Sequence, residues 1–539
     1  MVAQQPPTDT SDDASRLSAL GYTPELSRVL SKFANFSVAF TYLSPMVGIY
    51  SLFVFGAGAG GPAYLWLMPI VVIGMLFVAM VFGELASHYP VAGALYQYSK
   101  YTVGPGYGWW VGWFYGIALL VTVAAVDTGS VGYITSLSNN WFNTTMDPTK
   151  HLTILVVTLC LLAVQTLVNI VGAKMMGRVA GFGTYVELLG TFGIAIILAI
   201  AGFHHGLGFL FTTQGAEHVH SNPLGLDFGG NWWTGAALIA ILAHVYIFYG
   251  FESAGDVAEE TIDATRQVPR TMRSALVVGG ITSFVLVAAL LLATPGTTKG
   301  YQTATSTAGG VPYILSTNIS WGWLNDLLLL VVIFAFFSCG SSVQGAGARL
   351  AFSYSRDGAI PGSKFVSKVS PRFHTPVNAI LIGAVVAVLF TLMVNLTPSE
   401  DKTFLFITYP KDVSALGALV SFGVSGIYLS FLLTVIGAIV AKARGWQAEG
   451  PFQLGKWSWL VTIVAFVYLG LMLANVVAPT GLDSPRALFN TDWVTLAVMF
   501  VIFVVGLVLF LVVRPWRTIT RHGHDDLERT GAERHGGHA

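Results

Sequence analysis

Twelve long apolar segments limit most strongly what this chain can fold into. They lie near residues 34–56, 64–87, 107–136, 152–171, 179–202, 235–257, 274–294, 326–349, 377–396, 413–441, 458–478 and 492–513. Each segment is long enough for the roughly 20 residues that an α-helix needs to cross a bilayer core of about 30 Å. The chain is 54% apolar and only 10% charged, which excludes an ordinary soluble domain. We therefore predict an all-α polytopic membrane protein with twelve transmembrane helices.

The distribution of Lys and Arg predicts the orientation of these helices. If the N-terminus is cytoplasmic, 22 of the 27 Lys and Arg residues fall in cytoplasmic segments and 5 fall outside. Because positive charges are enriched on the cytoplasmic side, we expect both termini in the cytoplasm and a multi-pass protein of the plasma membrane. Acidic residues also number 27, so no net charge favours binding to nucleic acid.

Two of the segments contain residues that interrupt a helix. The first segment holds Pro45, which has no backbone N–H, and Gly48 follows it closely. The sixth holds the stretch 249–256, in which two glycines and two carboxylates interrupt the apolar run. Interrupted helices are tolerated in lipid only where they line a cavity. Breaks at equivalent positions of two halves of five helices are typical of a transporter site between inverted repeats. The alternative is a kink that serves packing alone.

Each break is expected to expose polar backbone groups in the middle of the membrane. Amide N–H groups at the start of the inner half-helix lie at the positive end of its dipole and suit an anionic group such as a carboxylate. Carbonyl groups at the end of the outer half-helix can accept hydrogen bonds from an ammonium group or coordinate a cation. The breaks therefore suit a small ligand with one or both kinds of charge.

Ionisable side chains inside the apolar segments are costly and often functional, and four of them are candidates here. Glu187 in the fifth segment and Glu252 in the sixth break are candidates to carry a proton. Asp127 lies in the outer part of the third segment, and His244 precedes Glu252 by two turns. Each residue also has a structural alternative. Glu252 would cap the broken helix, and Glu187 would hydrogen-bond a serine or the backbone. Asp127 would only face the outer vestibule, and His244 would be an interior histidine with its hydrogen bonds satisfied.

Three groups of motifs carry a resemblance to a known family. The chain resembles the amino acid–polyamine–organocation superfamily of permeases, especially its amino acid/choline transporter branch. The motifs are GELASHYPVAGALY at 83–96, YGFE at 249–252 with AEE at 258–260 and VPR at 268–270, and SRDGAIP at 355–361. Together they extend the resemblance over about residues 30–515.

The resemblance implies a 5+5 inverted-repeat core like that of the leucine-transporter group, with helices 1 and 6 broken and helices 11 and 12 appended. We accordingly divide the chain into an N-terminal cytoplasmic tail (1–30), the transport core with helices 1–10 (31–441), helices 11 and 12 (442–514) and a C-terminal cytoplasmic tail (515–539). We expect the first tail to be disordered apart from a short surface helix. The second carries His522, His524, His535 and His538 and is expected to bind nothing specific.

The resemblance also implies a substrate site midway through the membrane, between helices 1, 3, 6 and 8. The first break would hold a substrate carboxylate, and the sixth would offer carbonyls to the amine beneath an aromatic lid. The implied substrate-binding residues are Ser44, Met46, Val47, Gly48, Trp113, Gly116, Tyr246, Phe248, Tyr249 and Gly250. The sequence departs from the family pattern twice: Glu187 stands where several bacterial relatives have Lys, and the first break lacks a Gly-x-Gly pattern.

These observations predict a secondary active transporter for an amino acid or related small amine, of the GABA, choline or polyamine class. We expect proton coupling through Glu187, Glu252 or both. Exchange without net ion coupling is one alternative, and sodium held by Glu187 with Ser341 or Ser342 is another. A membrane sensor would need a signalling domain that the short tails do not offer.

We expect no enzyme and no cofactor, because no metal-ligand spacing, nucleophile motif or phosphate loop is present. Charged residues near the cytoplasmic helix ends are expected to form an inner gate or ordinary surface pairs. One group combines 258–260 with Arg270 and Arg273, and the other combines Arg349 with 356–357.

Overall fold

The computed structural model describes residues 10–216, 231–306, 309–395, 402–404, 407–409, 415–479 and 493–519. Almost all of the described elements are helices. The two strands, β1 (Lys402–Phe404) and β2 (Ile407–Tyr409), form one short antiparallel hairpin. The histidines of the C-terminal tail lie outside the described residues. An all-helical polytopic architecture is thus confirmed.

Ten helical stretches in the described part of the chain are long and apolar enough to cross a membrane, and two shorter apolar helices, α9 and α16, accompany them. The long elements are α2 (Lys32–Leu43) continued by α3 (Pro45–Gly60), α4 (Met68–His88), α6 (Pro105–Phe142), α7 (His151–Val171), α8 (Ala173–Ala201), α11 (Ala264–Leu292), α14 (Gly322–Arg356), α17 (Ala415–Ala443), α18 (Ser458–Val477) and α19 (Val494–Val513). The shorter two are α9 (Ala236–Ile247) and α16 (Val377–Asn395). Every predicted apolar segment contains one of these helices; a count of twelve spans and an inverted repeat stay predictions.

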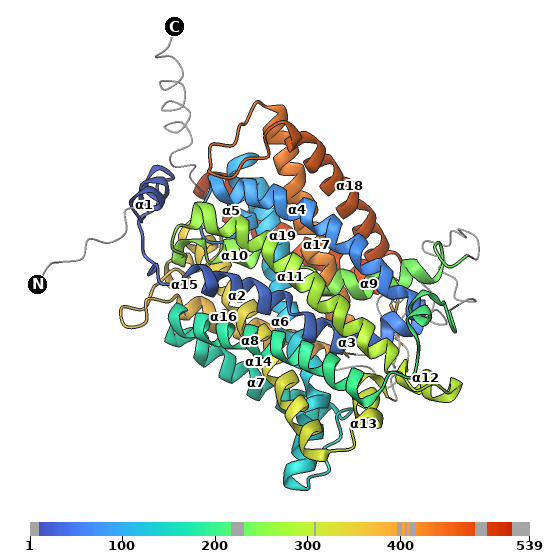
Figure 1. Ribbon diagram of the computed structural model, residues 1–539. Helices are drawn as coiled ribbons and strands as arrows, with labels where there is room; N and C mark the ends of the chain where they lie inside the picture. The colour runs from blue at the N-terminus through green and yellow to red at the C-terminus, as the bar shows by residue number, and fades with distance from the viewer. Residues whose placement is uncertain are drawn as a thin grey trace, which may run out of the picture.

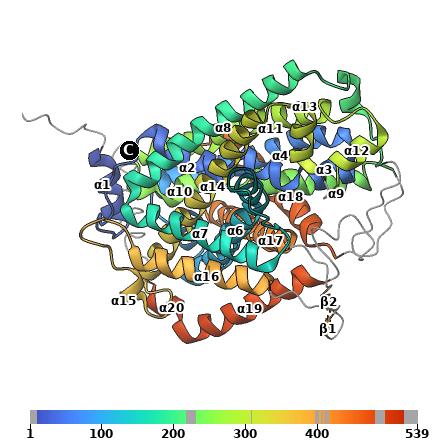
Figure 2. The ribbon, with the colours of Figure 1, turned by 90° about the horizontal axis from the view of Figure 1, so that it is seen from below.

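Short helices join and flank the long ones. They are α1 (Thr10–Ala19), α5 (Ala94–Thr102), α10 (Ser253–Asp256), α12 (Thr298–Ala304), α13 (Gly310–Asn318), α15 (Ser363–Val366), α20 (Pro515–Thr518), and the 3-10 turns η1 (Pro62–Leu67), η2 (Leu207–Phe211), η4 (Ala258–Glu260) and η5 (Gly455–Trp457). The long helices lie alongside one another in a bundle (Figure 1). Figure 2 shows α1, α15 and α20 at one end, here called the α1 end, and α12, α13 and the hairpin at the other, the α13 end.

The broken first helix lies in the centre of the bundle. Of the 18 consecutive residues of α2 and α3 that are most apolar, 89% are buried, whereas the share is 6% for the same length of the stretch that contains α19. A helix that is apolar all round and faces lipid, such as α19, needs no protein cover for its side chains. The interruption at α2 and α3 is instead surrounded by protein, which is where irregular backbone is tolerated in a membrane.

The N-terminal segment packs against the α1 end, so the expectation of disorder is wrong for residues 10–30. Leu17, Leu20 and Leu30 are fully buried there. Asp13 forms an ion pair with Arg28 at 3.0 Å and accepts a hydrogen bond from the first amide of α11. Burial of these leucines stabilises the packing of the segment against the bundle, although its composition is mostly polar. The expected short helix is confirmed as α1, but it is docked.

Candidate functional site

The first helix is broken at one residue, Ser44. Helix α2 ends at Leu43 and α3 begins at Pro45, while Ser44 adopts a left-handed conformation with φ of 37°. Pro45 has no N–H for the carbonyl of Thr41 and its fixed φ suits the first position of a new helix. The predicted break is confirmed, but it is narrower than expected because residues 46–48 belong to the first turn of α3.

The second break is wider and runs from 248 to 252, between α9 and α10. Gly250 has φ of 106°, a conformation that side chains disfavour, and its amide donates to Glu252 Oε2 at 2.8 Å. Within the described part of the chain, no hydrogen bond ends on the carbonyl oxygens of residues 246–249. This break therefore presents a row of unpaired acceptors in the interior of the bundle.

The two breaks touch each other. A Cβ on Gly250 would lie 2.7 Å from the backbone nitrogen of Leu43, and a Cβ on Gly48 would lie 3.2 Å from the Ile247 Cβ. The rings of Tyr42 and Tyr249 meet edge to face at 6.0 Å between centroids. Sequence reasoning placed these segments together by analogy with inverted repeats, and the structure brings them into direct contact.

Glu187 of α8 lies at the first break. Its side chain is 0% exposed, and its Oε2 accepts a hydrogen bond from the Ser44 hydroxyl at 2.9 Å. The carboxylate also lies against the backbone N–H of Met46, while Oε1 has no other partner. A carboxylate at this position faces the positive end of the α3 dipole, which stabilises its negative charge.

A second buried acidic group lies beside the other break. Tyr115 of α6 donates to Asp256 Oδ2 at 2.7 Å and to Glu252 Oε1 at 3.3 Å. Both carboxylates are 0% exposed, and Asp256 Oδ1 has no partner. Glu252 thus holds the backbone of the break through the Gly250 amide, but it makes no side-chain hydrogen bond that caps α10, which was its structural alternative. Sequence reasoning missed Tyr115, because its place on α6 opposite the break depends on tertiary packing.

Four interior carboxylates have no basic partner among the described residues. Asp127, Glu187, Glu252 and Asp256 are all fully buried, and the described ion pairs involve none of them. Buried carboxylates without a cation are costly. The interior therefore favours the presence of protons or of a cationic ligand.

Two predicted third-helix residues face other parts of the bundle. Trp113 donates from Nε1 to the carbonyl of Ile502 at 3.0 Å, which directs its indole toward α19. Gly116 faces α14, where a Cβ would lie 3.4 Å from Leu350 Cδ2. The residue of α6 that reaches the second break is Tyr115 instead.

The remaining interior candidates have local partners. Asp127 accepts a hydrogen bond from Gln165 of α7 at 2.7 Å, so it points toward α7 and not into an open vestibule. His244 bonds the Tyr64 carbonyl through Nε2 at 3.0 Å and stacks on the Tyr64 ring, but its buried Nδ1 has no partner, so the expected satisfied histidine is met at one ring nitrogen only. Ser342 bonds Thr41 of α2 at 2.8 Å.

Two neighbouring serines of α14 have no partner for their hydroxyl groups. Ser341 and Ser338 both carry a buried Oγ without a hydrogen bond. Ser338 faces Gly183 of α8, one turn before Glu187. The predicted coupling residues of α8 and α14 therefore lie on facing helices beside the first break.

A cavity of about 350 Å³ lies at the α13 end. Tyr50 and Tyr133 line it, together with Asn140, whose side chain is exposed. Tyr50 follows Ser44 by six residues, which is about 9 Å along α3. Tyr133 donates to the Tyr50 carbonyl at 3.0 Å, and the two rings meet edge to face. Two packed aromatic rings thus form part of the wall of this cavity.

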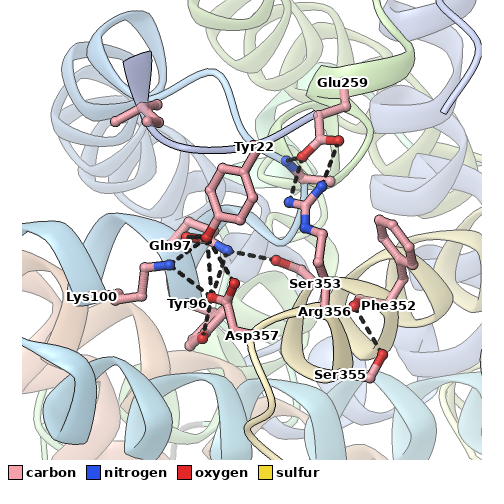
Figure 3. A network of polar contacts seen from close by, with 12 residues as sticks. Tyr22, Tyr96, Gln97, Lys100, Glu259, Phe352, Ser353, Ser355, Arg356 and Asp357 are labelled. Carbon is pink, nitrogen blue, oxygen red and sulfur yellow. Dashed lines mark hydrogen bonds and ion pairs between the residues drawn. The ribbon is translucent and has the colours of Figure 1, made fainter. Parts of the chain in front are cut away.

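The α1 end is closed by a polar network (Figure 3). Asp357, which follows α14, forms an ion pair with Lys100 of α5 at 2.7 Å and accepts from Tyr96 at 2.6 Å. Tyr22 of the N-terminal segment also donates to Asp357, at 2.9 Å, and accepts from Lys100. Burial and the neighbouring Asp357 charge raise the pKa of Tyr22 well above its usual value. The N-terminal segment is thereby joined to α5 and α14.

Two buried ion pairs complete this closure. Arg349 binds Glu260 through two hydrogen bonds of 2.9 and 3.0 Å, and Arg356 binds Glu259 at 2.7 Å. The predicted grouping of 258–260 with Arg270 and Arg273 is wrong, because the carboxylates of η4 turn toward α14. The alternative of ordinary surface pairs is also wrong, since the Arg349 and Glu260 side chains are at most 1% exposed.

Comparison with known proteins agrees with this architecture. Residues 33–505 match the family described as amino acid permease. The chain belongs to the amino acid permease family. Among its relatives are amino-acid permease BAT1 of Arabidopsis thaliana, 26% identical over 84% of this chain and 86% of the relative, and a putative polyamine transporter of Candida albicans, 25% identical over 94% and 88%. Family members are transporters, so this permease is a membrane transporter of amino acids or related amines, which supports the expectation that it is no enzyme.

Proposed function

We propose that this permease is a secondary active transporter that moves an amino acid or small amine through a site formed by the two breaks. The contact between Gly250 and the end of α2 carries the proposal, because it sets the two interrupted backbones side by side in the bundle interior. The proposed substrate-binding residues are those predicted at the breaks, from Ser44 to Gly48 and from Tyr246 to Gly250. Tyr115 joins them from α6.

Alternating access follows from the different states of the two ends. The α1 end is closed by buried ion pairs, and a cavity of about 350 Å³ approaches the breaks from the α13 end. The charge distribution predicts that the α1 end is cytoplasmic, in the plasma membrane, with both termini on that side. Movement of one part of the bundle against the rest would open the α1 end after closing the other.

Protons are the proposed coupling ion. Glu187 and Glu252 lie at the two breaks, each buried and without a basic partner among the described residues. A carboxylate in such a place is neutralised most simply by a proton that it takes up on one side of the membrane and releases on the other. Sodium bound by Glu187 with Ser341 or Ser342 is the second candidate, supported by the unpartnered Ser341 hydroxyl.

Transport by the purified permease in liposomes tests these statements. We expect counterflow of labelled substrate, accumulation driven by an acidic exterior, loss of accumulation with a protonophore and no effect of replacing sodium. Counterflow without accumulation would indicate an exchanger, and binding without counterflow would indicate a sensor. A Glu187→Gln variant should lose the response to pH, and an unchanged response would exclude Glu187 from coupling.

A further inference from the structure

We propose that Glu187 occupies the place of a substrate carboxylate, so that the permease selects amines over the amino acids from which they derive by decarboxylation. The inference rests on the proposed function, since it concerns the substrate of the same site. It names the substrate class as amines without an α-carboxylate and Glu187 as the residue that determines this specificity.

The first turn of α3 has no donor left for a substrate. Four N–H groups at a helix start lack partners within the helix. Here Pro45 has no N–H, Met46 faces the Glu187 carboxylate, Val47 donates to Ser44 Oγ at 3.2 Å and Gly48 donates to the Ser44 carbonyl at 3.1 Å. All positions that would bind a ligand carboxylate are thus satisfied by this chain.

A second carboxylate at this place would also meet the charge of the first whenever Glu187 has released its proton. Glu187 is fully buried, its Oε1 has no other partner, and no basic side chain pairs with it among the described residues. Like charges in a site of low polarity repel strongly. An amino acid would therefore have to displace Glu187 from α3 before its carboxylate could bind.

The second break offers what an ammonium group requires. Its carbonyls at 246–249 accept no hydrogen bond in the described part of the chain, and the Tyr246 and Tyr249 rings lie 5.8 Å apart beside it. Aromatic faces and free carbonyls both attract an amine cation. Glu252 and Asp256 add negative charge on the same side. The second break can thus bind a positively charged group, whereas the first break has no donor left for a negatively charged one.

Equilibrium binding to the full-length protein in detergent, with pairs of compounds that differ by one carboxylate, tests this inference. The pairs are putrescine and ornithine, cadaverine and lysine, histamine and histidine, tyramine and tyrosine, and GABA and glutamate. For each pair that binds, we expect the decarboxylated member to bind at least about tenfold more tightly.

Two substitutions assign the preference to Glu187. In Glu187→Ala, the α3 amides become free, and we expect the preference to fall below about threefold or to invert. Glu187→Gln keeps the size and the acceptor for Ser44 but removes the charge, so it provides the same test if the alanine variant does not fold. Asp127→Asn is the matched control, because it neutralises a buried carboxylate that accepts from Gln165, whereas Glu187 accepts from Ser44. It should leave the ratio unchanged.

The outcomes separate the inference from the proposed function. Equal or tighter binding of the amino acid by the unmodified protein would overturn the inference and leave the proposed transport intact. An unchanged ratio of amine to amino acid affinity in both Glu187 variants would also overturn the inference. A ratio that falls equally in Asp127→Asn would overturn it as well. If none of the ten compounds binds, the inference is refuted, while counterflow of another labelled amino acid or amine would still support the proposed function.

Discussion

Replacing Gly250 by alanine tests whether the contact between the two breaks is as close as the structure has it. Gly250 has φ of 106°, and a Cβ there would lie 2.7 Å from the Leu43 nitrogen and 2.9 Å from the Tyr42 ring. A left-handed backbone costs a residue with a side chain about 1–2 kcal/mol. Forcing a methyl group into a packed interior costs about 1–3 kcal/mol more. We therefore expect Gly250→Ala to lower the free energy of unfolding by about 2–5 kcal/mol.

A matched glycine separates the two costs. Gly202, after α8, has nearly the same φ of 103°, but nothing lies within 4 Å of the Cβ that an alanine would add. Gly202→Ala should therefore show a backbone cost alone, without the cost of forcing a methyl group into a packed interior. Denaturant titration in mixed micelles measures both variants, and uptake in liposomes should be lost only in Gly250→Ala. Equal stability and equal uptake of the two variants would show that the breaks do not touch.

Three further perturbations address the closed end and the second break. Glu260→Gln should lower the free energy of unfolding by about 3–5 kcal/mol, measured by denaturant titration, because it leaves Arg349 buried without its partner. Adding Arg349→Met should recover part of that loss. A double variant less stable than the single one would contradict this. Tyr22 has its pKa raised in the folded protein by burial and by Asp357, so docking of the N-terminal segment should be stable below about pH 10 and weaken above it, as measured by limited proteolysis. A segment that loosens on acidification instead would refute that sign. Tyr115→Phe removes a 2.7 Å hydrogen bond to the buried Asp256 carboxylate. It should reduce uptake driven by a pH gradient at least about tenfold while counterflow persists. Equal losses in both assays would exclude a role of Tyr115 in coupling.

The sequence predicts most of the helices and both breaks because these depend on local chemistry. Apolar length defines a membrane helix, and Pro45 and Gly250 interrupt one for reasons that are visible without a fold. The width of each break is less predictable. Pro45 begins α3 immediately after Ser44, whereas residues 248–252 stay outside any helix, since Glu252 holds the Gly250 amide at 2.8 Å.

The partners of charged groups could not be predicted, because they lie far apart in the chain. Glu260 and Arg349 are 89 residues apart, and Tyr22 and Asp357 are 335 residues apart. Sequence proximity favoured Arg270 for the acidic motif, yet η4 directs its carboxylates to α14. The docking of residues 10–30 could not be predicted either, because polar composition alone indicates disorder. The surface that buries the leucines of this segment exists only in the folded bundle.

The two ends of the bundle are closed by different chemistry, and the difference determines what opening each end requires. At the α1 end, separation of Glu260 from Arg349 leaves two charges in a dry interior unless water enters at the same moment. At the α13 end, Tyr50 and Tyr133 line the cavity, and a ring that moves aside leaves no charge unpaired. In the proposed transport cycle, opening toward the α1 end is therefore the step that would need hydration of the gate. A cationic ligand or a proton at the breaks would assist that proposed step by neutralising the carboxylates that have no basic partner among the described residues.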